Sequence, residues 1–403
     1  MDGRLHSDGI TAMRICFRAM KIAIVGTGSF AQCFIPLYKA HPLVSKVVLA
    51  DLNPEKLDEN RLRHGIDETY SSLEAVLESD VDAVALLTQN WMHGPQAVKA
   101  LNAGKAVYSA VPAGITIAEV EELVRTVEST GRIYMIGETS YYYPGAIYCR
   151  QQFAKGAFGK VVYSEGEYYN DWDHGLYEVM KARAGDRWRE EGGMPPMHYP
   201  THSTGGIISI LNSYATHVSC QGFVDHDEDG IYAPGANAYD NPFSNQTALF
   251  RMADGSMMRV NEFRRIGHPG AERMSMFGTE GCYHNTCAGQ VWTEKNEVTR
   301  LEDVLTCGRR KLPGHPDIEA EFEDVAPIHQ IERLPKEFAG LSNGHQGSHQ
   351  FLVHEFVTSV VDGKQPQNSV WQAARYLLPG LVAHQSSVRG GELLSIPDYG
   401  SGN

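Results

Sequence analysis

The feature that most constrains the fold is a buried-strand pattern followed at once by a glycine-rich turn. Lys21–Val25 is a short apolar run, which predicts a strand buried on both faces of a parallel sheet. Gly26–Ala31 then has the spacing G-x-G-x-x-A and leads into a helical pattern over Gln32–His41. In such a unit the glycines permit a tight turn and let the backbone approach a pyrophosphate, which binds at the helix N-terminus. The pattern predicts a dinucleotide site.

A second strand pattern, Val47–Asp51, ends in an acidic residue. A carboxylate at this distance after the turn suits the ribose hydroxyls of a dinucleotide. No arginine follows Asp51, and its charge would repel the 2′-phosphate of NADP, so we expect NAD. The alternative, an ordinary strand–helix turn without a ligand, is disfavoured by this second element.

The strand–helix alternation continues to residue 136. Strands are predicted over Val81–Leu87, Ala106–Ser109 and Arg132–Ile136, and helices over Ser71–Ser79, Pro95–Ala103 and Ile115–Thr130. This order predicts an α/β fold with a doubly wound parallel Rossmann sheet, whose ligands bind at the carboxyl ends of the strands. The residues expected around the cofactor are Gly26, Thr27, Gly28, Ser29, Phe30, Ala31, Asp51, Thr88, Asn90, His93, Ser109, Val111, Pro112 and Glu138.

The chain has 403 residues, which exceeds the usual size of one domain. We expect an N-terminal extension at residues 1–20, an NAD-binding domain at 21–142 and a second domain at 143–403. Shorter strand patterns and a turn at 253–255 predict that the second domain is α+β with a mostly antiparallel open sheet. Residues 307–341 are predicted to form a long irregular loop, and the final helices, at 350–361 and 370–387, to pack back on the first domain.

The composition narrows the partners to small molecules. A formal net charge of −14 argues against nucleic acid and anionic membrane surfaces. No apolar run approaches the roughly 20 residues of a membrane span. The seven cysteines are scattered without a C-x-x-C motif, which fits a reducing cytoplasm better than a disulfide framework.

Several motifs occur together in a pattern that resembles one family, the Gfo/Idh/MocA oxidoreductases. The motifs are Gly26–Gly28, Asp51, Thr88–His93, Pro112, Gly156–Gly159, Gly278–Gly281 and Ile396–Tyr399, so the resemblance spans nearly the whole chain from Lys21. It implies that the protein oxidises or reduces a secondary hydroxyl of a carbohydrate with NAD. It also implies a substrate pocket on the open sheet and a homo-oligomer formed through that sheet.

Two departures from the family pattern indicate one branch. The family usually has Glu-Lys-Pro, whose lysine relays the substrate hydroxyl proton, where this chain has Ala110–Pro112. It tends to have an Asp four residues before a helix-borne histidine, where this chain has His198 before His202. The runs Val111–Ala113 and Tyr199–His202 resemble the NAD-dependent glycosidases of glycoside hydrolase family 109, although Ala110 replaces that branch's acidic residue.

The branch implies a redox-neutral reaction. A hydride leaves C3 of the sugar, the C2 proton is removed, the aglycone leaves C1, water adds and the hydride returns. A net sugar dehydrogenase, in which Tyr199 or His202 replaces the lysine, is the first alternative. A non-catalytic NAD-binding regulatory protein is the second.

The predicted catalytic residues are His202 and Tyr199. Pro200 suits the first turn of a helix over Thr201–Asn212, because its missing N–H is not needed there. Near the positive end of the helix dipole, His202 is expected to be neutral, as a general base requires. The alternative for His202 is a hydrogen-bonded structural residue.

Aromatic and polar side chains predict contacts with the sugar, and we expect them from Tyr142, Asp171, Trp172 and His198. The alternative for Asp171 and Trp172 is a capped loop. The pairs His198/His202 and His345/His349 have the spacing of metal ligands, but no Cys or Asp completes either set, so no metal is predicted.

Overall fold

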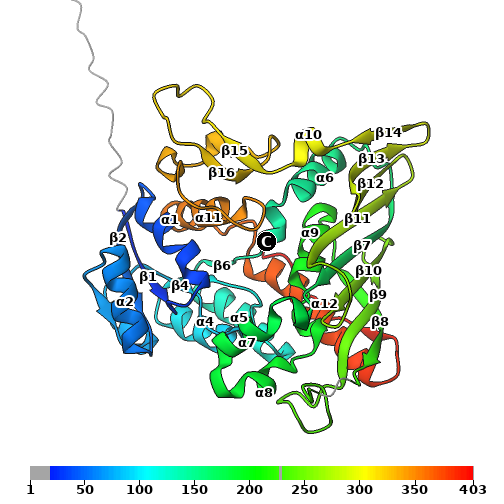
Figure 1. Ribbon diagram of the computed structural model, residues 1–403, viewed down its shortest axis with the longest axis horizontal. Helices are drawn as coiled ribbons and strands as arrows, with labels where there is room; N and C mark the ends of the chain where they lie inside the picture. Colours follow the sequence, from blue (N-terminus) through cyan, green and yellow to red (C-terminus); the bar gives the residue numbers. More distant parts are fainter. Residues whose placement is uncertain (1–18, 227–228, 403) are drawn as a thin grey trace, which may run out of the picture.

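The computed structural model describes residues 19–226 and 229–402 (Figure 1), so nearly all of the expected N-terminal extension lies outside the described residues. Two large sheets organise the described part. The first is parallel, and its six strands lie in the order β3 (Thr69–Tyr70), β2 (Val44–Ala50), β1 (Met20–Val25), β4 (Ala83–Leu86), β5 (Ala106–Ser109) and β6 (Tyr134–Ile136). The predicted doubly wound parallel sheet is confirmed.

Helices alternate with these strands, as predicted, but two differ from the expectation. The helix predicted over Gln32–His41 is a 3-10 turn, η1 (Phe30–Cys33), followed by a short helix, α1 (Ile35–Ala40). A helix that the apolar pattern did not reveal, α2 (Pro54–His64), follows β2. The others are α3 (Leu73–Leu77), η2 (Asn90–Met92), α4 (His93–Asn102), α5 (Ile117–Thr130) and η3 (Thr139–Tyr142).

The second sheet has nine strands. In order they are β14 (Glu297–Arg300), β13 (Gly289–Glu294), β12 (Gly281–Thr286), β11 (Ala271–Gly278), β7 (Val161–Tyr169), β10 (Met257–Phe263), β9 (Phe243–Met252), β8 (Ala215–Val224) and β17 (Leu394–Ser395). Among the described residues of this sheet, only β7 and β10 pair in parallel, so the prediction of a mostly antiparallel sheet is confirmed, and so is the turn that joins β9 to β10. The division of the chain into domains at residue 142 stays a prediction.

Most helices of this part lie on the side of the second sheet that faces the first (Figure 1). They are α6 (Pro144–Ala154), α7 (Leu176–Ala184), α8 (Trp188–Gly192), α9 (Thr201–Leu211) and α10 (Glu302–Leu305). The chain between α10 and α11 is not wholly irregular, because it forms a two-stranded sheet, β15 (Gly308–Arg310) and β16 (Phe322–Val325). Phe322 and Phe338 of this segment are fully buried in one core with Ile22 of β1, so the segment packs on the parallel sheet instead of standing apart.

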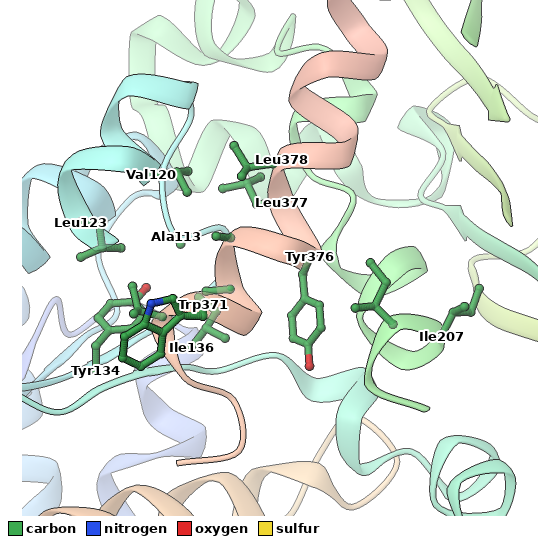
Figure 2. Close-up of a cluster of buried hydrophobic side chains, with 14 of the residues drawn as sticks. Ala113, Val120, Leu123, Tyr134, Ile136, Ile207, Trp371, Tyr376, Leu377 and Leu378 are labelled. Carbon is green, nitrogen blue, oxygen red and sulfur yellow. The ribbon is translucent and has the colours of Figure 1, made fainter. Parts of the chain in front are cut away.

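Both C-terminal helices pack back across the first sheet. α11 (Ser348–Asp362) buries Leu352 and Phe356 in the same core as Ile22. α12 (Val370–Val388) places its side chains between α5 and α9. Figure 2 shows Trp371 near Leu123, Leu377 near Val120 and, farther along the same cluster, Ile207. Asn368 accepts the Ile136 N–H through its backbone oxygen, which covers the free edge of β6. No helix in the described ranges is long and apolar enough to cross a membrane.

Candidate active site

The glycine-rich turn has the backbone geometry that a dinucleotide needs. Gly26 has a φ of +88°, and a Cβ atom there would lie 2.7 Å from the Leu87 oxygen at the end of β4, so only glycine fits. A Cβ atom on Gly28 would meet nothing within 4 Å, so the loop is open on that side. Within the described chain, no hydrogen bond uses the N–H groups of Gly28, Ser29 or Phe30. These free donors fit the oxygens of a pyrophosphate.

Asp51 directly follows β2 and closes over the same turn. Its Oδ2 accepts hydrogen bonds from the Thr27 N–H at 2.7 Å and the Thr27 hydroxyl at 2.8 Å, and its Oδ1 accepts the Asn53 N–H at 2.8 Å. A carboxylate offers about four acceptor positions, so one remains for a ribose hydroxyl. The negative charge would oppose a 2′-phosphate, and the site therefore fits NAD.

The ends of β4 and β5 are tied together by His93. Its Nδ1 lies 2.9 Å from the Pro112 oxygen and its Nε2 lies 3.0 Å from the Thr88 oxygen, while burial lowers the pKa of His93. Both ring nitrogens are thus engaged, so His93 positions the strand ends and is not free to bind a cofactor. Ser109 is fully buried and donates its hydroxyl hydrogen to the Ala110 oxygen.

Among the other residues expected at the cofactor, Thr88, Asn90 and Val111 are half-buried at the strand ends, where a ligand can reach them. Ala31 and Pro112 are buried and support the loop and strand end from below. Phe30 lies against His345, and therefore connects the cofactor loop to the neighbouring pocket.

That pocket lies between the start of α9 and the second sheet. Its lining residues are Ser140, Tyr143, Gly145, Ala146, His202, Ser203, Gly206, Glu272, Arg273, Met274, Tyr283, Asn285, Gln290 and Gln346. No lysine of the described chain is among them, so none supplies this pocket with the amine that the resemblance leads one to expect at residue 111.

Within this pocket, His202 forms an ion pair with Glu138. The second residue of α9, His202, has its Nδ1 3.1 Å from Glu138 Oε1, and Glu138 is fully buried. Burial lowers the pKa of His202, but the carboxylates of Glu138 and Glu272 more than offset this and raise it well above 6.5. Burial works against the Glu138 carboxylate, yet His202 and the Ser140 N–H hold its pKa below the usual value. The pair is therefore carboxylate and imidazolium at neutral pH.

The expectation of a neutral His202 is thus wrong. A helix end carries only about half a unit charge, whereas the Glu138 carboxylate places a full opposite charge 3.1 Å away. Because Nδ1 is engaged by Glu138, Nε2 is the nitrogen that remains for a ligand, and it has no hydrogen bond within the described residues. As an imidazolium, His202 presents an N–H group at that atom.

Glu272 and Tyr143 form the polar wall beside His202, and no motif in the sequence singled out Glu272. The Tyr143 hydroxyl donates to Glu272 Oε2 and lies 3.1 Å from Thr139 Oγ1. Glu272 is the second residue of β11, and the short strand patterns of this region did not reveal that its side chain faces the pocket.

Tyr142, which was predicted to contact substrate, points away from the pocket. Its hydroxyl donates to Glu355 Oε2 at 2.7 Å, and its ring stacks on Phe351 of α11. Successive side chains of a 3-10 turn such as η3 point about 120° apart, so neighbouring tyrosines face different directions. Tyr143, the next residue, is the one that lines the pocket.

Tyr199 lies beside His202, as the sequence predicts. The two rings meet edge to face with centroids 5.3 Å apart, and Tyr168 of β7 packs against both. Tyr199 is half-buried, and its hydroxyl has no hydrogen bond to any described residue. The start of α9 is fixed from the sheet side, because a Cβ atom on Gly166 of β7 would lie 2.0 Å from the Ser203 oxygen.

Three other predicted substrate residues are not brought to the pocket. Trp172 is fully buried in a separate small core and donates its Nε1–H to the Tyr232 hydroxyl at 3.1 Å. Asp171 accepts the N–H groups of Asp173 and Ile266, which fits the capped-loop alternative. His198 packs edge to face on His384 of α12, and burial, then His384, lowers its pKa to about 3.

The histidine spacings do not assemble a metal centre. His198 faces α12 whereas His202 faces Glu138, so the first pair diverges. His345 and His349 meet at 2.9 Å, but no group of three or more His, Cys, Asp or Glu in the described ranges is placed to hold a metal ion.

Comparison with known proteins agrees with this geometry. Residues 20–138 match the family described as an oxidoreductase family with an NAD-binding Rossmann fold, Gfo/Idh/MocA. The first third of the chain, from Met20 to Glu138, thus matches the family that the sequence resemblance indicated. The matched segment is an NAD-binding Rossmann fold, so NAD is the cofactor, and the match supports an NAD-dependent oxidoreductase.

Its relatives include proteins named for glycoside hydrolysis. A glycosyl hydrolase family 109 protein of Stenotrophomonas maltophilia is 22% identical over 96% of this chain and 90% of its own. An alpha-N-acetylgalactosaminidase of Bacteroides fragilis is 34% identical, but over only 33% of this chain and 32% of its own. In fold, the chain is similar to levoglucosan dehydrogenase in complex with NADH and levoglucosan, with a TM-score of 0.71, 16% identity and coverage of 94% of this chain and 100% of the other.

Proposed function

We propose that this protein cleaves a glycoside with NAD and without net oxidation. The observation that carries the proposal is the Glu138–His202 ion pair at a pocket that no described lysine lines. A proton donor held by a buried carboxylate suits protonation of a leaving group, which is a step that a net dehydrogenase does not have. The family 109 names of relatives that span nearly the whole chain support the same assignment.

The chain's residues have separate tasks in this reaction. Bound NAD would accept a hydride from C3 of the sugar and return it at the end. The half-buried Tyr199 contacts the C3 hydroxyl and passes its proton toward solvent. Once C3 is a ketone, loss of the C2 proton expels the aglycone from C1, and His202 donates a proton from Nε2 to the departing oxygen. Glu138 holds Nδ1 meanwhile, and His202 recovers its proton from the water that adds to C1.

The test is to follow aglycone release and NADH absorbance together, with the purified holoprotein and a panel of aryl glycosides. We expect aryl alcohol to be released without accumulation of NADH, and a deuterium placed at C3 to be retained in the product. Steady accumulation of NADH without aryl release would instead establish a net dehydrogenase. If NAD binds but neither signal arises across the panel, the protein is non-catalytic.

Two variants test the residue roles. His202→Gln removes the proton donor, and we expect aryl release to fall by roughly 10² to 10⁴, the usual contribution of a positioned acid. His354→Gln is the matched control, because His354 pairs with His41 at 3.0 Å on α11, away from the pocket. Equal rates for His202→Gln and His354→Gln would refute the assignment.

A further inference from the structure

We propose that His345 is the base that removes the substrate's C2 proton, a role that rests on the proposed function. His202 cannot fill this role while it holds a proton against Glu138. The elimination therefore needs a second group near His202 with a free lone pair, and the segment before α11 supplies one.

His345 lies at the junction of the cofactor loop and the pocket. Its ring is stacked over His202, with centroids 6.4 Å apart and planes inclined by 25°, and its other neighbour is Phe30 of the cofactor loop at 6.0 Å. The next residue, Gln346, lines the pocket. His345 is exposed, so a ligand that spans loop and pocket can reach it.

The backbone around His345 is strained. His345, Gln346 and Gly347 have φ values of +49°, +53° and +84°, a left-handed run that costs about 1 to 3 kcal/mol at each of the two non-glycine residues. Asp324 and Asn343 hold the run, because Asp324 Oδ2 accepts the Gly347 N–H and Asn343 Nδ2 donates to the Gly347 oxygen. Backbone strain of this kind clusters at active sites, where it fixes the direction of a side chain.

His349 orients the His345 ring. The Nδ1 of His345 lies 2.9 Å from Nε2 of His349, and His349 is buried against Phe34. Burial, and then His345, lowers the pKa of His349 to about 3, so His349 stays neutral; a base at His345 requires the tautomer in which the His345 Nδ1–H donates to His349 Nε2. The lone pair of His345 is then on Nε2, which has no hydrogen bond within the described residues.

The charged neighbours of His345 come from several elements. They are Glu272 on β11, His202 on α9, Glu138 after β6, Asp324 on β16 and His349 on α11. Although His345 is open to solvent on one side, the atoms packed around its ring partly desolvate it, and this and the charge of His202 lower its pKa. The three carboxylates only partly offset this effect. Two histidines of one site thus differ in charge, which is the arrangement that separates an acid from a base.

The elimination balances with these two residues. The C2–H proton goes to His345 Nε2, and the electron pair of that bond forms a C1=C2 double bond beside the C3 ketone. The C1–O bond breaks with its electron pair on the aglycone oxygen, which takes the proton from His202. When water adds at C1 and its proton passes to His202, His345 returns a proton to C2, so both histidines regain their starting states.

The experiment measures C2 exchange and C3 hydride transfer separately in the holoprotein. His345→Asn is the main variant, because Asn tolerates a left-handed backbone. In D2O we expect aryl release and deuterium uptake at C2 to fall by roughly 10² or more, with single-turnover hydride transfer within about threefold of wild type. His345→Gly leaves space for free imidazole, which is expected to restore C2 exchange, and His354→Asn serves as the control.

The outcomes separate the two proposals. If wild type cleaves glycosides and His345→Asn keeps C2 exchange, His345 is not the base. The same conclusion follows if His345→Asn loses both C2 exchange and hydride transfer and imidazole does not restore C2 exchange to His345→Gly. If Glu272→Gln abolishes C2 exchange while His345→Asn does not, Glu272 holds the role instead. If wild type cleaves no glycoside, the proposed function fails, and this inference fails with it.

Discussion

Replacing Glu138 by Gln should show how much the buried ion pair contributes to stability. Two opposite unit charges 3.1 Å apart attract by about 5 kcal/mol at an effective dielectric constant of about 20. Removing one partner of a buried pair usually costs about 3 to 5 kcal/mol. The amide oxygen of the substituted side chain can still accept the Ser140 N–H, which lies 2.8 Å from Glu138 Oε1, so the change isolates the charge.

The loss should depend on pH in a defined direction. The pKa of His202 is raised from 6.5, so its contribution is complete below pH 6.5 and disappears as pH rises through the raised value. The pKa of Glu138 is lowered from 4.5, so its contribution is complete above pH 4.5. Glu138→Gln should therefore lose about 3 to 5 kcal/mol at pH 6 and much less at a pH above the raised value of His202.

Urea unfolding at pH 6 and at a strongly alkaline pH measures this difference, provided that wild type and variant have equal m-values. Glu355→Gln is the matched control, because the buried Glu355 carboxylate binds the Tyr142 hydroxyl and the Gln367 N–H instead of a histidine. A loss in Glu138→Gln that is below about 1 kcal/mol at pH 6, or equal at both pH values, would refute the ion pair.

Three further predictions concern close approaches and charge. Gly26→Ala should weaken NAD binding at least about tenfold in calorimetry, because the new Cβ would lie 2.7 Å from the Leu87 oxygen at a φ of +88°. Asp51→Asn should narrow the preference for NAD over NADP about tenfold or more in the ratio of the two Kd values, and an unchanged ratio would contradict its place at the ribose. Gly166→Ala should destabilise the fold by about 3 kcal/mol or more in urea, because its Cβ would lie 2.0 Å from the Ser203 oxygen, and a change below about 1 kcal/mol would show that β7 and α9 are not so close.

The sequence was sufficient for five strands of the parallel sheet because each of these is a short apolar run between polar turns. The strand β3 was not predicted, because it has only two residues and both are half-buried. α2 was missed because its only buried residue is Asn60, so no apolar stripe marks it. Its ends were nonetheless visible, since Asn53 caps the Glu55 and Lys56 N–H groups and Gly65 ends the helix with a φ of +57°. For a helix on the outside of a sheet, the capping residues are a clearer sequence signal than the hydrophobic pattern.

The candidate site was predicted only in part, because its residues meet through tertiary packing. His202 and Glu138 were both predicted as site residues. Their contact joins residues 64 positions apart, so neither the contact nor the positive charge that it gives His202 could be predicted from the sequence. Trp172 was selected for its aromatic ring, which the fold uses to fill a small core. His345 was noticed only for its spacing from His349, and its position over His202 depends on how α11 packs on the first sheet.

The packing of α12 has a consequence for the order of synthesis. The parallel sheet is complete in sequence by Ile136, yet Trp371 and Leu377 of α12 cover part of the core that this sheet forms with α5 (Figure 2). More than two hundred residues must therefore leave the ribosome after β6 before the cofactor domain can be closed. We expect the nascent first domain to expose an apolar surface throughout that interval, and a chain cut before residue 370 to need a chaperone to remain in solution.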